Sequence, residues 1–595
     1  MNAPSATIRA ESTRPDTRAE TTHEGVKDTL ESIIVAFVLA FVFRAFVIEA
    51  FVIPTGSMAA TLLGKHGTIT CKDCGYEFDY GLTDLSTPGP TVEERQGQYG
   101  PNSRAVCPNC RYENTQLRVN DRAKNAEAGD RILVLKWPWE IDRASLGAKR
   151  WDVTVFKDPS DGTTNFIKRM AGLPHEVLMI VDGDVYAVPE ASLSPQSLET
   201  FQYYRQVKQL LQANSIGFKD RPAEERERYN RLTPQERVLF DHPMPEAVLR
   251  ELERKLTIQR KTDEAQDSLW FIVYDHDYPP VDWHEGQPAW MPLNRAESGW
   301  NADPKEERVQ ERRVRFNGIG KPRQGLAFSA GASAGGPIND AYAYNLAGVS
   351  RNPVADLRLS FVLAPQGGEG SLWLKLSKRG NAFWARLQRD GHVSLTRTDG
   401  REPDGVDALA NGRVRPFNDG DKRRIVFEDV DYRVRLYVDD QVVLETTPQQ
   451  YSPDLHAIRA ESMRASETPR IFAENLQLEL WHLMLQRDVY YSRAQDGQGF
   501  ARLPWGIDGN PILLADGEYF MLGDNSPQSQ DSRLWARIGP HLRNRENYQL
   551  GTVPRDQLIG RAFFVYWPSG LRIPWLPILR DYGIIPNVGR MRWIR

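Results

Sequence analysis

Two short motifs that lie far apart in the chain carry side chains able to do covalent chemistry together. The first, Pro54 to Met58, presents Ser57 on a glycine-containing turn directly after an apolar segment. The second, Phe166 to Pro174, holds Lys168 among apolar neighbours. A serine needs a base to become a nucleophile, and a lysine becomes that base where burial disfavours its ammonium form. The pair predicts a hydrolysis in which Ser57 attacks and Lys168 accepts its proton.

A third motif, Tyr519 to Trp535, contains a Gly-Asp-Asn turn followed by small polar residues and an Asp–Arg pair. By itself it is weak evidence, because many hydrogen-bonded surface loops have this composition. Placed after the serine and lysine motifs, it becomes specific. The three together resemble the PSGSM-type, KRVVGLPGD-type and GDNxxxSxDSR-type motifs of type I signal peptidases. The resemblance covers about Leu30 to Gly64, Ala128 to Val188 and Asp516 to the C-terminus.

The resemblance implies an activity and assigns residues to it. It implies a membrane-bound serine endopeptidase that removes N-terminal signal peptides from secreted preproteins through a Ser–Lys dyad, with no catalytic cofactor. Ser57 stands at the nucleophile and Lys168 at the general base. Thr55 stands where a hydroxyl helps the Ser57 N–H bind the oxyanion, although capping the turn is a simpler role for it. Ser529 stands where a serine orients the lysine amine. The positions that support the site are Asp524, Asp531 and Arg533, and those that line the substrate pocket are Ile53 and Ile167.

The chain departs from the family pattern near the lysine motif. His175 and Trp151 stand where the family commonly has glycine. Neither residue replaces the nucleophile or the base, so the departures concern the geometry of two turns. We interpret His175 as a surface turn residue, not as the base of a Ser–His mechanism, because the serine motif and the third motif contain no histidine.

An apolar stretch precedes the serine motif. Leu30 to Ile48 is long enough to cross a bilayer as a helix. A cleaved signal peptide is the alternative, because the uninterrupted apolar part, Ile33 to Phe43, is short. We favour an uncleaved anchor, since the preceding arm mixes acidic and basic residues. A mild excess of basic residues before the stretch favours a cytoplasmic N-terminus. We expect a single-pass protein of the cell (inner) membrane with its catalytic domain on the extracytoplasmic side.

The four cysteines form two CxxC pairs, Cys71 with Cys74 and Cys107 with Cys110. Two such pairs can place four thiolates around Zn²⁺ as in zinc ribbons, although the gap between these pairs is long for a ribbon. Disulfides are the alternative, because an oxidising exterior favours them. We expect a structural zinc ion, because a site filled by four protein ligands leaves no open position for catalysis.

The length of 595 residues predicts several domains, and the net charge of −4 implies no general attraction to nucleic acid. Strand-like runs flank an Asp182-Gly183 turn, which predicts a β-hairpin in a β-rich core. From about Ser192, apolar residues at helical spacing among dense charge predict a solvated spacer. From about Asp356, many short strands predict an antiparallel sandwich that resembles laminin-G or concanavalin-like domains, with an unknown ligand.

We therefore expect a mainly β chain with two insertions in its catalytic core. The expected parts are a cytoplasmic arm (1–28), the anchor (29–48), the catalytic domain (49–66, 128–190 and 492–595), a zinc-ribbon-like insertion (67–127), a helical and charged spacer (191–300) and the sandwich (301–491). Because the insertions lie outside the resemblance, we expect the catalytic unit to tolerate removal of 192–487.

Two other functions fit parts of the sequence less well. A self-cleaving repressor with Ser–Lys chemistry is disfavoured by the anchor and by the lack of an evident DNA-binding helix pair. A non-catalytic envelope binding protein, in which the sandwich does the binding, is disfavoured by the presence of both Ser57 and Lys168. The expected partners are secretory preproteins and the lipid bilayer, with no nucleic acid.

Overall fold

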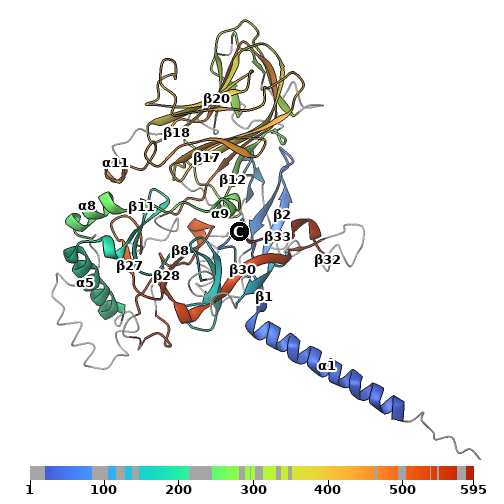
Figure 1. Cartoon of the computed structure of the whole chain (residues 1–595), viewed down its shortest axis with the longest axis vertical. Helices are drawn as coiled ribbons and strands as arrows, with labels where there is room; N and C mark the ends of the chain where they lie inside the picture. Colours follow the sequence, from blue (N-terminus) through green and yellow to red (C-terminus); the bar gives the residue numbers. More distant parts are fainter. Residues whose placement is uncertain are drawn as a thin grey trace, which may run out of the picture.

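The structure is a computed structural model that describes most of the chain. The described residues are 20–82, 105–114, 127–136, 147–212, 244–280, 289–294, 296–301, 312–329, 337–345, 352–460, 466–492, 504–535, 538–543, 545, 548–571 and 585–595. They form a projecting helix, a central β-rich part and a large β-sandwich above it (Figure 1). The arm predicted for 1–28 lies largely outside the described residues.

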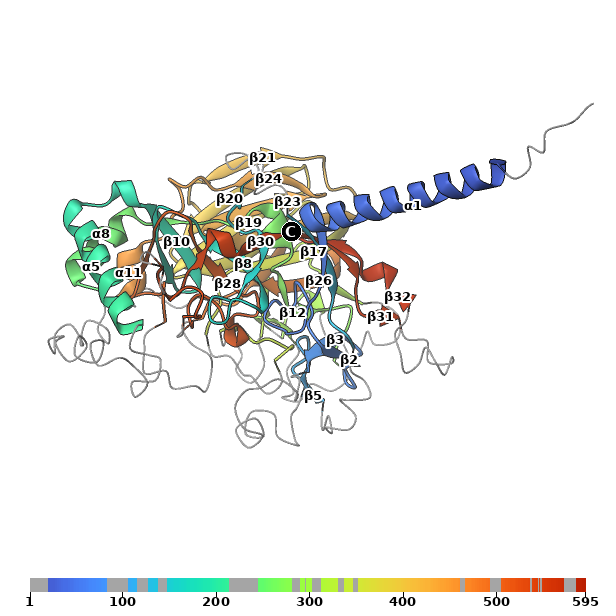
Figure 2. The same ribbon diagram turned by 90° about the horizontal axis from the view of Figure 1, so that it is seen from below.

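The N-terminal helix α1 (Glu20–Phe46) projects away from the rest of the chain in both views (Figures 1 and 2). Residues Lys27–Phe46 have a mean hydropathy of 2.0 and are long enough to span a membrane. Apolar side chains along it, such as Phe37 and Phe41, are exposed. An exposed apolar helix of this length favours a lipid environment, because water would not solvate it.

The helix leads directly into the main sheet of the central part. In spatial order its strands are β1 (Ile48–Val52), β6 (Arg131–Leu135), β30 (Leu558–Trp567), β7 (Val153–Lys157), β8 (Asn165–Gly172), β28 (Glu518–Leu522) and β29 (Val553–Pro554), and β33 (Arg592–Trp593) also pairs with β30. All three segments predicted for the catalytic domain thus contribute strands to one sheet. The C-terminal strand β30 lies between β6 and β7, which joins the serine and lysine segments through a third segment.

A second, smaller sheet carries the predicted hairpin. Its order is β27 (Ile512–Leu514), β9 (Glu176–Val181), β10 (Asp184–Pro189) and β11 (Thr257–Ile258). Asp182 and Gly183 form the turn with φ angles of 52° and 86°. Two successive positive φ angles give the turn the twist that suits a tight hairpin, and Asp-Gly adopts them readily.

The helices after this hairpin are more than the solvated spacer predicted for 191–300. The described helices are α5 (Pro195–Gln212), α8 (Glu246–Lys255) and α9 (Asp263–Asp267), with α11 (Leu455–Arg459) later in the chain. Val248, Leu249 and Leu252 of α8 are buried in the same core as the hairpin. The helical spacing of the apolar residues indicates a buried stripe on α8. The dense charge on the other face of the helix led the sequence analysis to expect full exposure to solvent.

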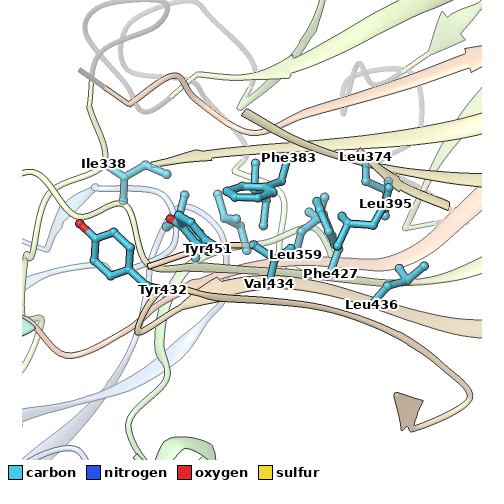
Figure 3. Packing of buried hydrophobic residues seen from close by; sticks show 14 of the residues in the cluster. Ile338, Leu359, Leu374, Phe383, Leu395, Phe427, Tyr432, Val434, Leu436 and Tyr451 are labelled. Carbon is cyan, nitrogen blue, oxygen red and sulfur yellow. The ribbon is translucent and has the colours of Figure 1, made fainter. Parts of the chain in front are cut away.

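The sandwich consists of two antiparallel sheets. One contains β14 (Trp300–Asn301), β15 (Arg313–Asn317), β26 (Gln477–Arg487), β17 (Leu357–Gly367), β22 (Arg423–Val430), β23 (Arg433–Val438) and β24 (Gln441–Glu445), with β12 (Phe271–Asp275) also on β26. The other contains β13 (Trp290–Pro292), β16 (Gln324–Phe328), β25 (Arg470–Glu474), β18 (Ser371–Lys378), β19 (Asn381–Gln388), β20 (His392–Thr398) and β21 (Ala410–Arg413). Leu359, Phe427 and Phe383 pack between the sheets (Figure 3). The sandwich therefore begins at β12, earlier than the predicted boundary at 301.

Three two-stranded sheets complete the described structure. They are β2 (His66–Thr70) with β3 (Glu77–Gly81), β4 (Ala105–Val106) with β5 (Glu113–Asn114), and β31 (Gly570–Leu571) with β32 (Ile585–Pro586). The first two carry the cysteine pairs at their ends.

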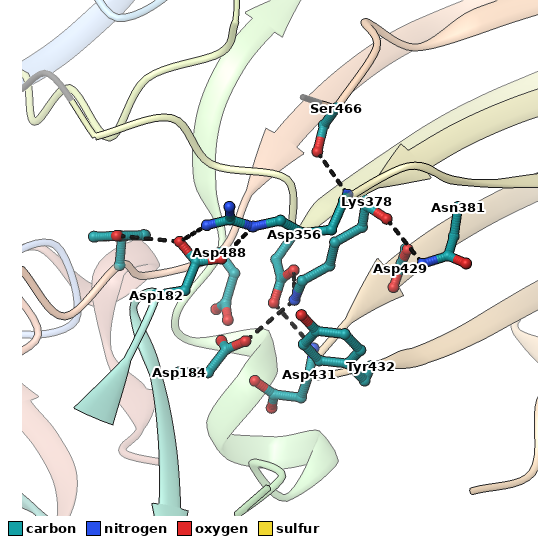
Figure 4. A network of polar contacts seen from close by, with 12 residues as sticks. Asp182, Asp184, Asp356, Lys378, Asn381, Asp429, Asp431, Tyr432, Ser466 and Asp488 are labelled. Atoms are coloured by element: carbon teal, nitrogen blue, oxygen red, sulfur yellow. Dashed lines mark hydrogen bonds and ion pairs between the residues drawn. The ribbon is translucent and has the colours of Figure 1, made fainter. Parts of the chain in front are cut away.

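The sandwich and the hairpin share a buried ionic network (Figure 4). Lys378 of β18 donates to Asp184 at the start of β10, with 3.2 Å between Nζ and Oδ2, and to Asp356. Lys261 lies 2.7 Å from carboxylate oxygens of both Asp431 and Asp488. Burial raises the pKa of Asp184 well above its usual value, whereas Lys378 acts in the opposite direction. Hairpin and sandwich residues also lie in one apolar cluster.

This shared interior contradicts the expected independence of residues 192–487. Removing them would take away Lys378 and expose hairpin side chains, such as Met179 and Tyr186, that now lie in this shared cluster. Exposing a fully buried apolar side chain to water costs about 1.5 to 3 kcal/mol. Sequence reasoning missed the coupling because the residues that form it are far apart in the chain.

We predict that Lys378→Met destabilises the protein. Loss of the ammonium leaves Asp184 and Asp356 facing each other without a cation, so the free energy of unfolding should fall by roughly 3 kcal/mol. Urea unfolding of the full chain in detergent, followed by near-ultraviolet circular dichroism, measures the change. Lys422→Met, which removes an exposed lysine from the same sandwich, serves as the control. Equal stability of the two variants would contradict the coupling.

Candidate active site

Ser57 lies in a tight turn directly after strand β1. The Ile53 N–H donates to the Asp130 carbonyl at 2.9 Å, which ties the end of β1 to the start of β6. The chain then turns, with Ala59 N–H donating to the Gly56 carbonyl at 3.0 Å. The Ser57 side chain is turned inward, with only 8% of the residue exposed.

Lys168 reaches this serine from the middle of the main sheet. It lies on β8, opposite Thr154 of β7, and β28 pairs with the other edge of β8. Its Nζ is 2.7 Å from Ser57 Oγ and 3.0 Å from the Ile167 carbonyl oxygen. The structure therefore brings together the two residues that the sequence paired on chemical grounds.

The surroundings of Lys168 favour its neutral amine. Burial lowers the pKa of Lys168 from 10.5 to about 8, while the nearby carboxylates of Asp531 and Asp524 act in the opposite direction. The burial effect prevails because the ammonium loses its hydration, and both carboxylates are bound to arginines. A neutral amine next to a hydroxyl can accept its proton, so the pair can act as base and nucleophile.

The third motif packs directly against the serine turn. The Asn525 N–H donates to the Ser57 carbonyl at 3.0 Å, and Asn525 Nδ2 donates to the Gly56 carbonyl at 3.0 Å. Gly523 permits this approach, because a Cβ there would lie 2.6 Å from the carbonyl oxygen of Ser57 and 2.1 Å from Ser529 Oγ. Asn525 was not assigned a role from the sequence, although it stands in the Gly-Asp-Asn turn.

Two buried ion pairs surround Lys168. Arg533 and Asp531 form a bidentate pair, with 2.9 Å between Nε and Oδ1 and 2.7 Å between Nη2 and Oδ2. Arg169 and Asp524 form a second one, with distances of 2.8 Å and 2.7 Å. Bidentate geometry satisfies both carboxylate oxygens and fixes the loops that carry them.

Arg169 was missed by the sequence analysis. It follows Lys168 directly, so its side chain points to the opposite face of the strand. There its Nη1 also donates to the Trp151 carbonyl at 2.9 Å. The position of Arg169 in a strand with several apolar residues was the signal in the sequence that it needs a buried carboxylate partner.

The remaining predicted residues lie around the pair. Ile53 and Ile167 are buried in one apolar cluster with Met58. Thr55 lies on the exposed side of the turn. Ser529 is fully buried, and its hydroxyl has no hydrogen-bond partner among the described residues. The roles assigned to these residues by resemblance therefore remain proposals.

The two departures from the family pattern share a backbone feature. Trp151 and His175 adopt positive φ angles of 74° and 64°. This left-handed region favours glycine, which is the residue expected at both positions from the resemblance. The turns thus keep a glycine-like geometry despite their side chains. His175 is exposed and lies 3.5 Å from carboxylate oxygens of Glu190 and Asp516.

The four cysteines form a compact cluster outside this site. Their Sγ atoms all lie within 4.8 Å of one another. The Sγ atoms of Cys71 and Cys110 are 3.5 Å apart, and those of Cys74 and Cys107 are 3.6 Å apart. These distances exceed the roughly 2.05 Å of a disulfide bond. The cysteines are therefore unbridged here.

Comparison with known proteins finds a family and several relatives. Residues 428–567 match the family model described as signal peptidase, peptidase S26. A probable signal peptidase I-2 of Synechocystis is 25% identical over 161 residues, covering 27% of this chain and 59% of that protein. A signal peptidase I of Pseudomonas fluorescens is 38% identical over 71 residues, covering 12% of this chain and 23% of that protein. The chain spans less than two thirds of the length of either relative.

Solved structures similar to this chain cover about a third of it. The carbohydrate binding module CBM66 from Bacillus subtilis has a TM-score of 0.22 and 12% identity, covering 33% of this chain and 95% of that one. A likeness at this TM-score carries no argument about the ligand of the sandwich. The resemblance to type I signal peptidases inferred from the three motifs is supported by the family match and the relatives.

We predict that the reactivity of Ser57 rises with pH through a midpoint near 8. Below the pKa of about 8 the amine is protonated and cannot accept the serine proton, and above it the amine is free to do so. The rate of labelling by a fluorophosphonate, which reacts with activated serines, measures this across pH. His175→Ala should leave the profile unchanged, whereas Lys168→Arg should abolish labelling. A midpoint near the ordinary lysine value of 10.5 would exclude the buried amine as the base.

Proposed function

We propose that this chain is a membrane-anchored signal peptidase I that cleaves signal peptides from secreted preproteins with a Ser57–Lys168 dyad. The observation that carries the proposal is the distance of 2.7 Å between Lys168 Nζ and Ser57 Oγ in a buried setting. The motif order, the peptidase S26 match and the signal peptidase relatives support the same reaction.

In the proposed reaction, neutral Lys168 accepts the Ser57 proton while Oγ attacks the scissile carbonyl carbon. The carbonyl π electrons move to the oxygen, which becomes an oxyanion. Lys168 then returns the proton to the leaving amine as the C–N bond breaks, and an acyl-enzyme remains on Ser57. Lys168 next takes a proton from water, whose oxygen attacks the ester carbonyl carbon. As the C–O bond to Ser57 breaks, Lys168 returns the proton to Oγ, and the signal peptide leaves with a new carboxyl group.

In this proposal the Ser57 N–H and the Thr55 hydroxyl donate hydrogen bonds to the oxyanion and stabilise it. Two donors held in place before the reaction lower the barrier by a few kcal/mol. Thr55 precedes Ser57 by two residues, and its exposed position allows rotation of the hydroxyl toward a bound substrate. Ser529, whose buried hydroxyl has no hydrogen-bond partner among the described residues, is proposed to orient the Lys168 amine.

The proposed substrate lies extended beside the bilayer. Helix α1 would anchor the chain with its N-terminus in the cytoplasm and the catalytic part outside, and it ends close to strand β1. Ile53 and Ile167 are proposed to line pockets that admit small side chains next to the cleavage site. Apolar walls also keep water from Lys168, which maintains its lowered pKa.

We predict that Ser57→Ala and Lys168→Ala each abolish processing of a preprotein in detergent or liposomes. The two side chains act as a unit, so the loss should be similar for both and for the double variant. Lys168→Arg should be nearly as inactive, because a guanidinium does not deprotonate near neutral pH. Turnover of the preprotein by Lys168→Arg at the wild-type rate would remove lysine as the base. Gel analysis of precursor and mature protein measures the outcome.

The cysteine cluster is proposed to hold one structural zinc ion. In a tetrahedral site with Zn–S bonds of about 2.3 Å, the sulfurs lie about 3.8 Å apart, close to the distances in this cluster. Asn114 Nδ2 donates to Cys71 Sγ at 3.6 Å, a hydrogen bond that would orient this sulfur toward a bound ion. Four protein ligands leave no open position, so the ion would serve structure and not catalysis.

The cluster also links the central part to the sandwich. Asn109, between Cys107 and Cys110, donates to the Tyr278 carbonyl at 2.7 Å and accepts from the Asp275 N–H at 2.7 Å. Asp275 is the last residue of β12, and Tyr278 lies three residues beyond it. Zinc binding would therefore fix the loop that carries Asn109 against the edge of the sandwich.

We predict one equivalent of zinc in protein purified without added metal. Chelation, or the double variant Cys74→Ser and Cys107→Ser, should remove the zinc and lower the thermal unfolding midpoint, because the loops lose their common ligand. Elemental analysis measures the metal, and thiol titration after chelation should find four free thiols. Protein with neither zinc nor free thiols would establish disulfides instead.

A further inference from the structure

A segment that precedes strand β17 of the sandwich lies against the serine turn. Residues 341–345, which we name the bracing segment, belong to the part of the chain that the sequence placed in the sandwich insertion. Its last residue, Asn345, exchanges two hydrogen bonds of 2.7 Å with the side chain of Asn525. Asn525 in turn holds the carbonyls of Gly56 and Ser57.

This chain of bonds fixes the direction of the Ser57 N–H. A peptide unit is planar and trans, so its N–H points opposite to its carbonyl. Asn525 Nδ2 holds the Gly56 carbonyl at 3.0 Å and thereby sets the plane of the peptide that contains the Ser57 N–H. The Gly56 carbonyl only accepts, so it requires the nitrogen of the Asn525 amide to face it, and the reciprocal pair with Asn345 holds the plane of that amide in place.

Tyr344 supports the same turn by packing. Its ring forms a small apolar cluster with Ala59 and Leu63, which follow Ser57. The contact is close, since a Cβ on Gly56 would lie 2.0 Å from Tyr344 Cε1. The Tyr344 carbonyl also accepts from the Gly81 N–H at 2.8 Å, which binds the bracing segment to strand β3.

The sandwich holds the bracing segment from its other side. Arg487, the last residue of β26, donates to the Ala341 carbonyl at 2.7 Å. Its guanidinium lies 4.6 Å from the ring centre of Tyr342 and 4.5 Å from that of Phe271 on β12. The position of the segment is therefore set by two strands of the sandwich.

We propose that Asn345 is a positioning residue for the reaction at Ser57: acting through Asn525, it orients the Ser57 N–H that receives the oxyanion. This inference rests on the proposed function and deepens it. The sandwich insertion then completes the active site and is not an independent module. Asn345 touches neither Ser57 Oγ nor Lys168, so its loss leaves the base and its pKa in place.

The kinetic test uses Asn345→Ala, Asn525→Ala and the double variant of the full chain. With a soluble signal-peptide substrate, Asn345→Ala should lower kcat roughly 10-fold to 100-fold, with KM within about twofold and an unchanged pH midpoint. Because Asn345 acts through Asn525, the double variant should be no slower than Asn525→Ala. Multiplied losses in the double variant, or an unchanged kcat in Asn345→Ala, would overturn the proposal. Asn411→Ala, an exposed asparagine of β21, is the matched control.

A second measurement does not depend on catalysis. Hydrogen exchange of the amides of residues 57–62 should become at least about fivefold faster in Asn345→Ala, whereas strand β19 keeps its wild-type protection. Equal acceleration in both regions would mean general destabilisation and would overturn a positioning role. If the wild-type protein cleaves no signal-peptide substrate, the proposed function fails, and the exchange of residues 57–62 alone decides whether Asn345 holds the turn.

Discussion

The burial of the Lys168 amine is the constraint on which the rest of the central part depends. An ammonium in this position would lose its hydration, so burial lowers the pKa of Lys168 to about 8 and makes the neutral amine accessible near neutral pH. Strand β8, which is paired on both edges, carries the Lys168 amine into the interior. The turn after β1 places Ser57 Oγ 2.7 Å from this amine.

The carboxylates near this amine would oppose its neutral form more strongly if they were unpaired. Asp531 and Asp524 both raise the pKa of Lys168, yet each is bound in two places by an arginine. Arg533 follows Asp531 in the same loop, whereas Arg169 comes from the face of β8 opposite to Lys168. The two pairs thus anchor the third motif to the sheet and limit the field that its carboxylates exert at the amine.

The sandwich is built into this arrangement by two kinds of contact. Lys378 pairs with Asp184 at the start of β10, so the sandwich and the hairpin share a buried ion pair. Asn345 contributes an amide pair that reaches the serine turn through Asn525. The insertion is long in sequence, but its interior contacts join it to the central part.

The sequence by itself indicated the proposed chemistry: Ser57 and Lys168, the third motif, the apolar helix and the paired cysteines are all local patterns whose residue types limit what they can do. The hairpin turn at Asp182-Gly183 was predictable for the same reason, because its conformation is set by neighbouring residues. The tertiary structure alone decided what lies across space. The start of the sandwich at β12, the partner of Arg169, the ammonium that faces Asp184 and the link from Asn345 to Ser57 all join residues far apart in the chain. Their local sequences carry no mark of those partners, because burial and hydrogen bonding are fixed only when the strands assemble.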